Sequence, residues 1–338
     1  MRFAAAGMAL LLAGCGGGFA WNAEVVFDAG IKLGACAIGD LDSEAGGEIV
    51  AVSQTGEIHV IRKRAGTWTA VTAFKAPGEM IQCAVGDADP DRPGNEIVAV
   101  GIAAGSEDDG GPGAAYLIRK EGDRWIGRHI FEDTALLHAV CITPEGVFVA
   151  GYANRVTLLR IRGEKVQTEP IADLPGSAKS AVPYQGGAAF ACTDGSLVHV
   201  TGSASRWKAT PADKRDSRRS RIGTDGSRLI ASDDDGTLSI IDAGARETVF
   251  KDSSKLRGGI LADLDPSSPG LEAATAGYSK AVTVFYRKTE GWEPRVVFTD
   301  TDRYHHLAVG DLDGTGGPDL AACGYSGRVV VVACQPVR

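Results

Sequence analysis

Hydrophobic and polar residues alternate along most of this chain in short runs, and each run is bounded by a turn that contains glycine. The segments EIHVIRK after Gly56, VTVFYRK after Ala281 and RVVVVAC after Gly327 show this pattern. They are rich in the β-branched and aromatic residues that suit a pleated, half-buried strand. Short strands separated by Asp-Gly and Ser-Gly turns at regular spacing predict an all-β protein.

The strand pattern repeats along the chain. Close copies begin at Cys36 (CAIGDLDSEAGGEIVAV), Cys83 (CAVGDADPDRPGNEIVAV), Ile260 (ILADLDPSSPGLEAATAG) and Leu307 (LAVGDLDGTGGPDLAACG). Three weaker copies begin at His138, Ser180 and Arg221 and lack the acidic loop. Seven copies from Ala20 onward give about 46 residues each, which is close to one blade of a propeller. The sequence therefore predicts a seven-bladed β-propeller of four-stranded blades.

Tryptophans indicate how such a ring is closed. Four of them open the predicted outermost strand of a repeat: Trp68, Trp125, Trp207 and Trp292. The segment Trp21–Phe27 has the same form but precedes the first complete repeat, and the last repeat ends without an outer strand. We therefore expect the N-terminal strand to complete the last blade, which leaves no open edges. The alternative is an open solenoid, which needs atypical capping repeats at both ends.

The loops of these repeats carry a family resemblance. The last repeat contains GDLDG from Gly310 and the pattern GxPDL from Gly316, and it resembles the FG-GAP and VCBS-type repeats of extracellular β-propellers. The variant DxDPxxPGxE, at Asp87 and Asp263, looks like the related form in rhamnogalacturonan lyase propellers. The resemblance spans the chain from Ala20 onward. It implies a propeller and permits either a binding module or an enzyme that acts on polysaccharide.

The N-terminus predicts an exported protein. Met1-Arg2 and an apolar stretch to Leu12 lead into Leu12-Ala13-Gly14-Cys15, which resembles the bacterial lipobox. This resemblance implies a signal peptide over 1–14, lipidation of Cys15, a tether over 15–19, a propeller over 20–338 and a lipid-anchored protein of the bacterial cell envelope. The alternative is an ordinary cleaved signal. After residue 19 no apolar run is long enough to cross a bilayer.

Charge and cysteine content narrow the picture. The 338 residues include 35 Lys and Arg against 43 Asp and Glu, a formal net charge of −8. That balance excludes the diffuse basic surface of a general nucleic-acid binder, so we expect no nucleic-acid partner and contact with the membrane only through the anchor. The six cysteines after Cys15 lack metal-type spacing, and we expect mostly buried free thiols.

The four strong copies each place oxygen-bearing side chains at alternate positions of the loop after the innermost strand. The carboxylates are Asp40, Asp42, Glu44 and Glu48; Asp87, Asp89, Asp91 and Glu96; Asp263, Asp265 and Glu272; and Asp311, Asp313 and Asp319. Such oxygens suit Ca²⁺, and the first two copies, with four carboxylates each, are the best candidates. These loops hold 14 of the 43 acidic residues. The alternative is a metal-free turn held by hydrogen bonds to backbone amides.

Residues just before each innermost strand are expected to gather at one mouth of the central channel. Besides Lys32, the candidate ligand-binding residues there are Gln82, His138, Lys179, Arg219, Arg257, His305 and His306. Such a ring can hold an anion or a uronate carboxylate. It can also supply the acid and base of a β-elimination, but no catalytic triad is recognisable, and a merely polar propeller mouth is the plainer alternative.

These patterns favour a surface-anchored, non-catalytic binding propeller that takes a protein or glycan ligand and has calcium-stabilised loops. A polysaccharide lyase, or another carbohydrate-active enzyme that uses the mouth, is the alternative.

Overall fold

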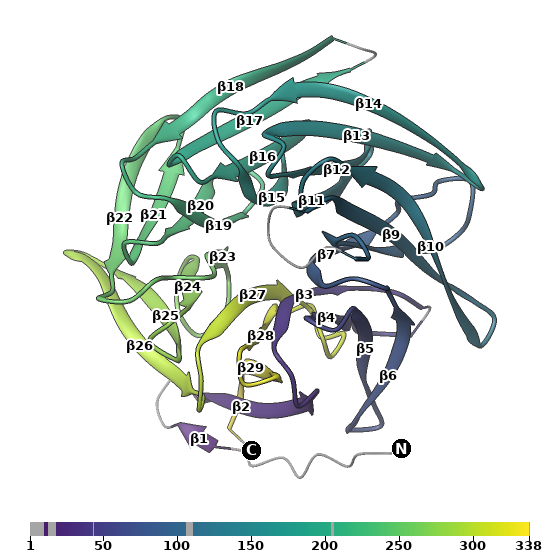
Figure 1. The fold of residues 1–338 in the computed structure, drawn as a ribbon. Coiled ribbons are helices and arrows are strands. Elements are labelled where there is room, and N and C mark those ends of the chain that lie inside the picture. The colour runs from purple at the N-terminus through teal and green to yellow at the C-terminus, as the bar shows by residue number, and fades with distance from the viewer. Residues whose placement is uncertain (1–9, 13–17, 43, 106–110, 204–205, 338) are drawn as a thin grey trace.

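The chain forms seven antiparallel sheets arranged as blades around a central axis (Figure 1). The computed structural model describes residues 10–12, 18–42, 44–105, 111–203 and 206–337. Within blades 1–6 the first strand lies nearest the axis and the fourth lies outermost. The predicted seven-bladed propeller of four-stranded blades is confirmed.

The blades follow one another in chain order. Blade 1 contains β3 (Leu33–Gly39), β4 (Glu48–Ser53), β5 (Glu57–Arg64) and β6 (Thr67–Lys75), and blade 2 contains β7 (Met80–Gly86), β8 (Glu96–Ile102), β9 (Gly113–Glu121) and β10 (Arg124–Asp133). Blade 3 contains β11 (Leu137–Thr143), β12 (Gly146–Gly151), β13 (Arg155–Arg162) and β14 (Lys165–Asp173), and blade 4 contains β15 (Ala178–Tyr184), β16 (Gly187–Cys192), β17 (Ser196–Ser203) and β18 (Arg206–Lys214). Blade 5 contains β19 (Arg219–Thr224), β20 (Leu229–Asp233), β21 (Thr237–Asp242) and β22 (Ala245–Lys251), and blade 6 contains β23 (Ile260–Ala262), β24 (Glu272–Ala276), β25 (Ala281–Lys288) and β26 (Gly291–Thr299).

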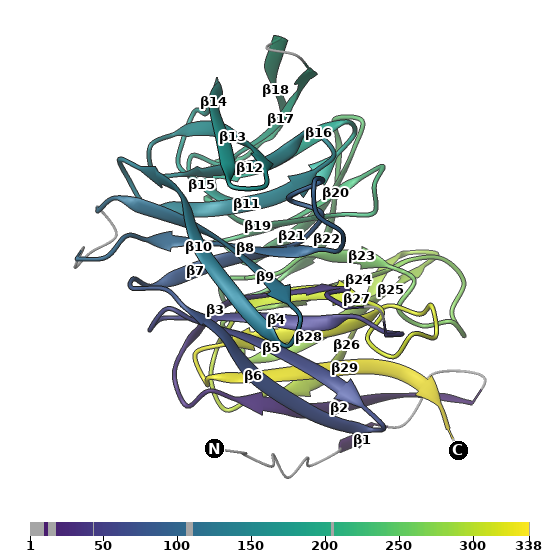
Figure 2. The ribbon, with the colours of Figure 1, turned by 90° about the vertical axis from the view of Figure 1, so that its right-hand side faces the viewer.

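Blade 7 is assembled from both ends of the chain. It contains β27 (Tyr304–Gly310), β28 (Asp319–Gly324), β29 (Arg328–Pro336) and β2 (Phe19–Asp28), with β1 (Leu10–Leu12) added at the outer edge. Viewed from the side, β2 lies beside β29 (Figure 2). Trp21 pairs with Cys334 and Asp28 with Arg328, so the N-terminal strand completes the last blade as predicted.

Burial follows the layers of each blade. All residues of β4, β16 and β28 are buried, because neighbouring blades cover both faces of these strands. Their sequences are accordingly almost continuous small and apolar runs. Outer strands such as β6 and β18 are mostly exposed. The four tryptophans do open outer strands, β6, β10, β18 and β26.

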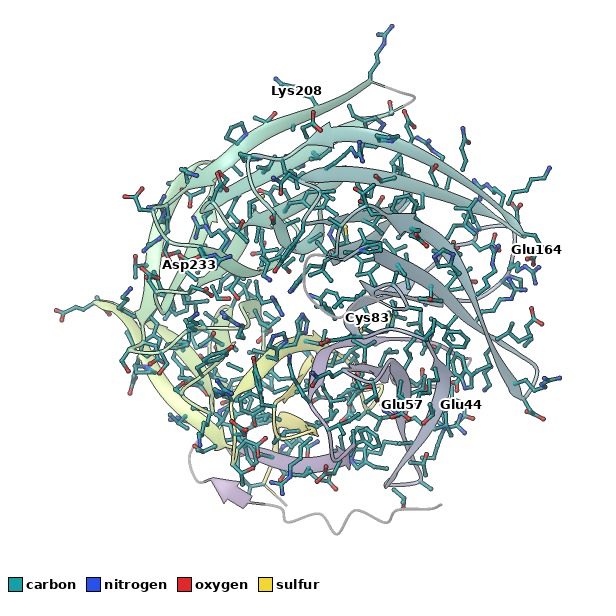
Figure 3. The ribbon with its side chains drawn as sticks, in the orientation of Figure 1. Glu44, Glu57, Cys83, Glu164, Lys208 and Asp233 are labelled. Atoms are coloured by element: carbon teal, nitrogen blue, oxygen red, sulfur yellow. The ribbon has the colours of Figure 1, made fainter. Side chains whose placement is uncertain are left out.

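The cysteines lie mainly in the interior. Five cysteines of the described ranges, Cys36, Cys83, Cys141, Cys192 and Cys323, are buried free thiols, and Cys334 is partly exposed. Figure 3 shows Cys83 near the centre of the ring, far from Lys208 on the rim. Across the last hairpin Cys323 pairs with Val329, and Cys334 pairs with Trp21 of β2.

The predicted export segment is largely outside the described residues. This holds for Cys15 and for all of 1–14 except Leu10–Leu12, which pairs antiparallel with β2 through Leu11 and Asn22. In the described ranges, no helix is long and apolar enough to cross a membrane.

Candidate functional site

A β-bulge near the start of the inner strands decides which side chains face the channel. In six blades the ladder slips by one residue, for example between Tyr304 and His306 and between Met80 and Gln82. The residue before each slip is buried, and in four of these blades the residue after it lines the channel. The slips fall at Leu33/Ala35, Met80/Gln82, Leu137/Ala139, Ala178/Ser180, Arg219/Arg221 and Tyr304/His306.

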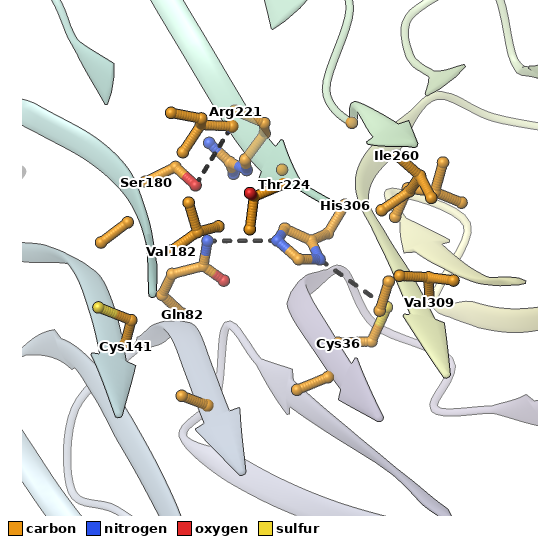
Figure 4. A pocket seen from close by; sticks show the side chains of 18 of the residues that line it. Cys36, Gln82, Cys141, Ser180, Val182, Arg221, Thr224, Ile260, His306 and Val309 are labelled. Atoms are coloured by element: carbon orange, nitrogen blue, oxygen red, sulfur yellow. Dashed lines mark hydrogen bonds between the residues drawn. The ribbon is translucent and has the colours of Figure 1, made fainter. Parts of the chain in front are cut away.

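The residues after the slip form a ring inside the channel. Gln82, Ser180, Arg221 and His306 are its polar members, and they line a cavity of about 290 Å³ (Figure 4). Below them the wall is apolar, with Val140, Val182 and Val309 among the lining residues. The cavity therefore combines one permanent cation with a hydrophobic wall.

Hydrogen bonds fix the state of His306. The Gln82 side-chain amide donates from Nε2 to His306 Nε2 at 3.3 Å, so Nε2 accepts and Nδ1 carries the proton. His306 Nδ1 lies 4.0 Å from Cys36 Sγ. Burial, followed by the nearby charge of Arg221, lowers the pKa of His306 to about 3. This imidazole is therefore neutral at physiological pH.

Two further histidines stand at the bulge, one layer nearer the mouth. His305 Nδ1 lies 2.6 Å from the Gly34 carbonyl, and it donates because a carbonyl oxygen only accepts. The His138 ring stacks on Tyr152 with the centroids 6.3 Å apart. Burial and then neighbouring cations hold the pKa of both imidazoles well below the usual range; Arg221 is one of those cations in both cases. All three histidines of the predicted mouth are therefore neutral.

Arg219 is not at the mouth, and that prediction is wrong. It precedes the bulge, at the position that Met80 and Tyr304 occupy in other blades, and is 1% exposed. Its Nη1 contacts Asp233 Oδ1 at 3.0 Å, and its Nη2 contacts the Asp213 carboxylate. Arg219 thus joins the fourth strand of blade 4 to the second strand of blade 5. The bulge instead turns Arg221 into the channel, and sequence reasoning missed that residue.

Three tyrosines at equivalent hairpins surround the mouth, each with a cation on its ring. Lys179 lies 5.0 Å from the Tyr152 ring centroid and donates to its hydroxyl at 2.8 Å. The Arg257 guanidinium lies 4.8 Å from the Tyr278 ring centroid. These contacts place two of the predicted mouth residues, Lys179 and Arg257, in a set with aromatic partners.

The third tyrosine extends the set. Arg303 lies between two rings, 4.9 Å from the centroid of Tyr278 and 4.2 Å from that of Tyr325. Lys32 lies 5.0 Å from the Tyr325 ring, and the two tyrosine hydroxyls are 3.0 Å apart. The tyrosines were not predicted as site residues. The repeated triplets GYA, GYS and GYS that begin at Gly151, Gly277 and Gly324 are the sequence signal that identifies them.

The acidic loops lie at the opposite end of the inner strands, and their last carboxylate has a structural role. Glu48, Glu96, Glu272 and Asp319 each begin the second strand of a blade and accept hydrogen bonds from backbone amides early in the loop. Donors include Leu41 N at 2.8 Å and Leu312 N at 3.2 Å. These four sets of hydrogen bonds, here called the amide lock, correspond to the metal-free alternative, and the last acid of the loop is their common element.

Only some of the predicted calcium ligands come together. Within the described ranges, the groups of three that can share one ion are Asp40, Asp42 and Glu48, and Asp311, Asp313 and Asp319. The second and third loops form no such group in the described chain, although the second was expected to be among the best. Asp89 is fully buried and accepts from Gly163 N at 2.9 Å, and Asp265 accepts from the Tyr286 hydroxyl at 3.0 Å. Asp87, Asp91 and Asp263 are exposed and Glu96 and Glu272 serve the amide lock.

The two candidate clusters differ in how their charge is balanced. In the first loop, Arg64 lies 2.5 Å from Asp42, 2.6 Å from Glu44 and 3.5 Å from Glu48. In the last loop, no ion pair joins Asp311, Asp313 or Asp319 to a described cation. Burial, and then the charges of Asp313 and Asp311, raises the pKa of Asp319 to about 7. The last loop is therefore the one in which a divalent cation would relieve the most repulsion.

Comparison with known proteins supports the fold alone. No protein-family model matches the chain, and no curated protein matches its sequence. Among solved structures, the WD40 β-propeller domain of Doa1 is similar, with a TM-score of 0.67 over 91% of this chain and 95% of that one. The two are 10% identical in sequence, so the similarity shows a shared architecture and carries no function.

Proposed function

We propose that this protein is a non-catalytic binding module of the bacterial cell envelope, anchored through lipid on Cys15, that takes an anionic glycan or protein ligand at the mouth of its channel. The propeller fold is consistent with a binding role. The observation that carries the proposal is the set of Tyr152, Tyr278 and Tyr325, each with a cation on its ring. Aromatic rings beside cations suit acidic sugars and acidic side chains alike.

The charge of the mouth supports an anionic ligand. Arg257 pairs with Asp234 at 2.6 Å, Arg303 lies 3.5 Å from Asp302 and Lys32 approaches Glu79 at 4.0 Å. Arg221 has no carboxylate among its described contacts, so its positive charge is the one that these pairs leave unbalanced. The chain as a whole has a net charge of −8. A positive mouth on an acidic protein attracts anions to one place and repels them elsewhere.

Binding by the chain from Ala20, on a glycan array and in pull-downs from envelope extracts, tests this proposal. We expect the double variant Lys32→Gln/Arg303→Gln to weaken capture about tenfold, equivalent to 1.4 kcal/mol. The matched control is Lys208→Gln, which removes an exposed cation on the rim. Equal loss in both variants, or binding that is insensitive to salt, would contradict recognition at the mouth.

A lyase acting on acidic polysaccharide is the second candidate, and Tyr278 is the observation that favours it. Although burial raises its pKa, the Tyr325 hydroxyl and the guanidinium groups of Arg257 and Arg303 lower the pKa of this phenol overall. A phenol of lowered pKa beside guanidinium groups is a chemically reasonable base for β-elimination. Incubation with pectic and ulvan-type polysaccharides tests this, and unsaturated product that disappears in Tyr278→Phe and in His138→Ala would establish an enzyme.

We also propose that Ca²⁺ binds the last acidic loop and, more weakly, the first. The last loop supports this through three clustered carboxylates without an ion pair in the described ranges. Chelator is expected to lower the melting temperature, and Asp313→Asn is expected to remove most of that sensitivity. Asp87→Asn, in a loop without a cluster, is the matched control. An unchanged melting curve in excess chelator would argue for metal-free turns.

A further inference from the structure

The channel contains a buried cation whose surroundings do not balance its charge. Arg221 is 3% exposed, and two other buried arginines, Arg219 and Arg257, are each paired with carboxylates. Arg219 is held by Asp213 and Asp233, and Arg257 by Asp234. None of the ion pairs in the described ranges involves Arg221. A buried charge without a partner of opposite sign is costly, so this position calls for a compensating group.

The hydrogen bonds of Arg221 leave donors unused. Its Nη1 reaches the carbonyls of Ser220 at 3.0 Å and Lys179 at 3.4 Å, and its Nε has no partner within the described chain. Its Nη2 lies 3.4 Å from His305 Nδ1, but that nitrogen already donates its proton to Gly34 and has no lone pair to offer. The Nε–Nη2 edge of a guanidinium is the edge that receives a carboxylate through two parallel hydrogen bonds.

The surrounding groups define the charge and shape of what fits. His138, His305 and His306 are neutral, because burial and adjacent cations lower the pKa of each. Arg221 is thus the one permanent charge among the side chains that line the described cavity. Ser180 and Gln82 add neutral polar groups at the same level, and the Gln82 Oε1 is itself without a partner within the described chain. One positive charge among neutral groups matches a singly charged anion better than a dianion.

The wall beyond Arg221 specifies the rest of the ligand. Val182, Ile222 and Val309 line the cavity of about 290 Å³ together with other aliphatic residues, and Figure 4 draws Val182 and Val309 among the side chains of the pocket. Water forms no hydrogen bonds with such a wall, whereas the transfer of an apolar group from solvent to this wall is favourable. The cavity therefore pairs a carboxylate-binding edge with space for a hydrocarbon body.

We propose that the central channel is a binding site for a small organic monocarboxylate, with its carboxylate on Arg221 and its apolar body against the valine-lined wall. This site goes beyond the surface recognition proposed above, because it takes one small molecule inside the ring. It requires neither the tyrosines of the mouth nor the acidic loops. The two proposals can therefore fail separately: loss of glycan or protein capture does not argue against the monocarboxylate site, and absence of monocarboxylate binding does not argue against recognition at the mouth.

Calorimetric titration of the full chain with butanoate, hexanoate and benzoate tests the site, with hexanamide and inorganic phosphate as comparison ligands. We expect one hexanoate per chain, tighter binding than butanoate, and no heat from hexanamide at the same concentration. Arg221→Gln is expected to weaken hexanoate at least tenfold, while Lys208→Gln, which removes an exposed cation on the rim, stays within twofold. Without ligand, Arg221→Gln is expected to melt higher than wild type, whereas a purely structural Arg221 predicts a lower melting temperature.

A second variant keeps the test independent of how Arg221→Gln folds. Val182→Phe narrows the cavity without touching the guanidinium, and it is expected to weaken hexanoate more than butanoate. Binding of hexanamide as tight as hexanoate, or phosphate binding as tight as hexanoate, would overturn the monocarboxylate assignment. Absence of binding by all three acids, or unchanged affinity in Arg221→Gln, would overturn the site itself.

Discussion

Trp21 is the residue on which closure of the ring can be tested most sharply. Its side chain is 2% exposed, and its indole Nε1 donates to the Tyr286 hydroxyl of blade 6 at 2.8 Å. Trp207 occupies the equivalent outer-strand position in blade 4, because Asp28 and Lys214 occupy the same ladder position and each lies seven residues after its tryptophan. The Trp207 Nε1 is buried without a partner within the described chain. The two tryptophans occupy equivalent positions and differ in two respects: Trp21 is buried and makes this hydrogen bond, whereas Trp207 is partly exposed and its Nε1 makes none within the described chain.

The expected effects of Trp→Phe at these positions follow from that difference. Both variants lose part of a packed ring, at a cost of about 1 kcal/mol for the buried Trp21 and no more than that for the partly exposed Trp207. Trp21→Phe also loses a buried hydrogen bond worth about 1 kcal/mol, for a total near 2 kcal/mol. Trp207→Phe removes an unsatisfied donor, which returns about 1 kcal/mol and leaves the free energy of unfolding almost unchanged. The two variants should thus differ by about 2 kcal/mol, or roughly 3 °C in melting temperature for a chain of 338 residues.

Urea unfolding followed by tryptophan fluorescence and circular dichroism measures this difference. Tyr286→Phe combined with Trp21→Phe completes a double-mutant cycle, in which we expect a coupling energy of about 1 kcal/mol. Equal destabilisation by Trp21→Phe and Trp207→Phe, or zero coupling to Tyr286, would refute the claim that this contact fastens the N-terminal strand to the ring.

Three further outcomes are expected. Arg219→Leu alone should lower the free energy of unfolding by about 3–5 kcal/mol, because it leaves Asp233 buried beside fewer cations. The double variant Arg219→Leu/Asp233→Gly copies the Leu and Gly of blade 3, and urea unfolding should show that it recovers most of that loss. Because the pKa values of the three buried histidines are lowered, their contribution to stability is complete above pH 6.5. The free energy of unfolding should fall as the pH drops below 6.5, by up to about 1.4 kcal/mol per pH unit for each histidine. His306→Asn should remove one such contribution in unfolding curves at pH 7, 6 and 5. Burial raises the pKa of the Cys192 thiol to about 12, so a thiol reagent should label the native protein at the partly exposed Cys334 and reach Cys192 only after denaturation; rapid labelling of Cys192 in the native state would contradict the packing.

The architecture could be predicted from the sequence because each blade repeats the same pattern of strands and loops. The repeated loops count the blades, and the likeness between the segments at Trp21 and Trp292 reveals which strand is missing from the last blade. Both signals are local in sequence, and a propeller repeats one local unit, so few arrangements satisfy them.

The site could be predicted only in part, because which side chains face the channel depends on a one-residue slip in the inner strands, and no sequence pattern predicts that slip. Arg219 and Arg221 are both cations at the start of an inner strand. The bulge sends the first between blades and the second to the axis, and a shift of one residue reverses the face of a strand. The acidic loops failed differently: equal spacing of carboxylates gave a cluster around Asp311 but not around Asp89, which the Gly163 amide of another blade holds away.

Because β2 completes the last blade, blade 7 can form only after the strands at the other end of the chain are present. The hydrogen bond from Trp21 to Tyr286 spans 265 positions of the chain, so β2 has no final partner until nearly the whole polypeptide has been made. A chain that stops early keeps an unpaired apolar strand at its front, which is the kind of surface that chaperones and proteases recognise. The order of synthesis therefore couples burial of β2 to completion of the chain, since β2 is covered only after β29 has been made.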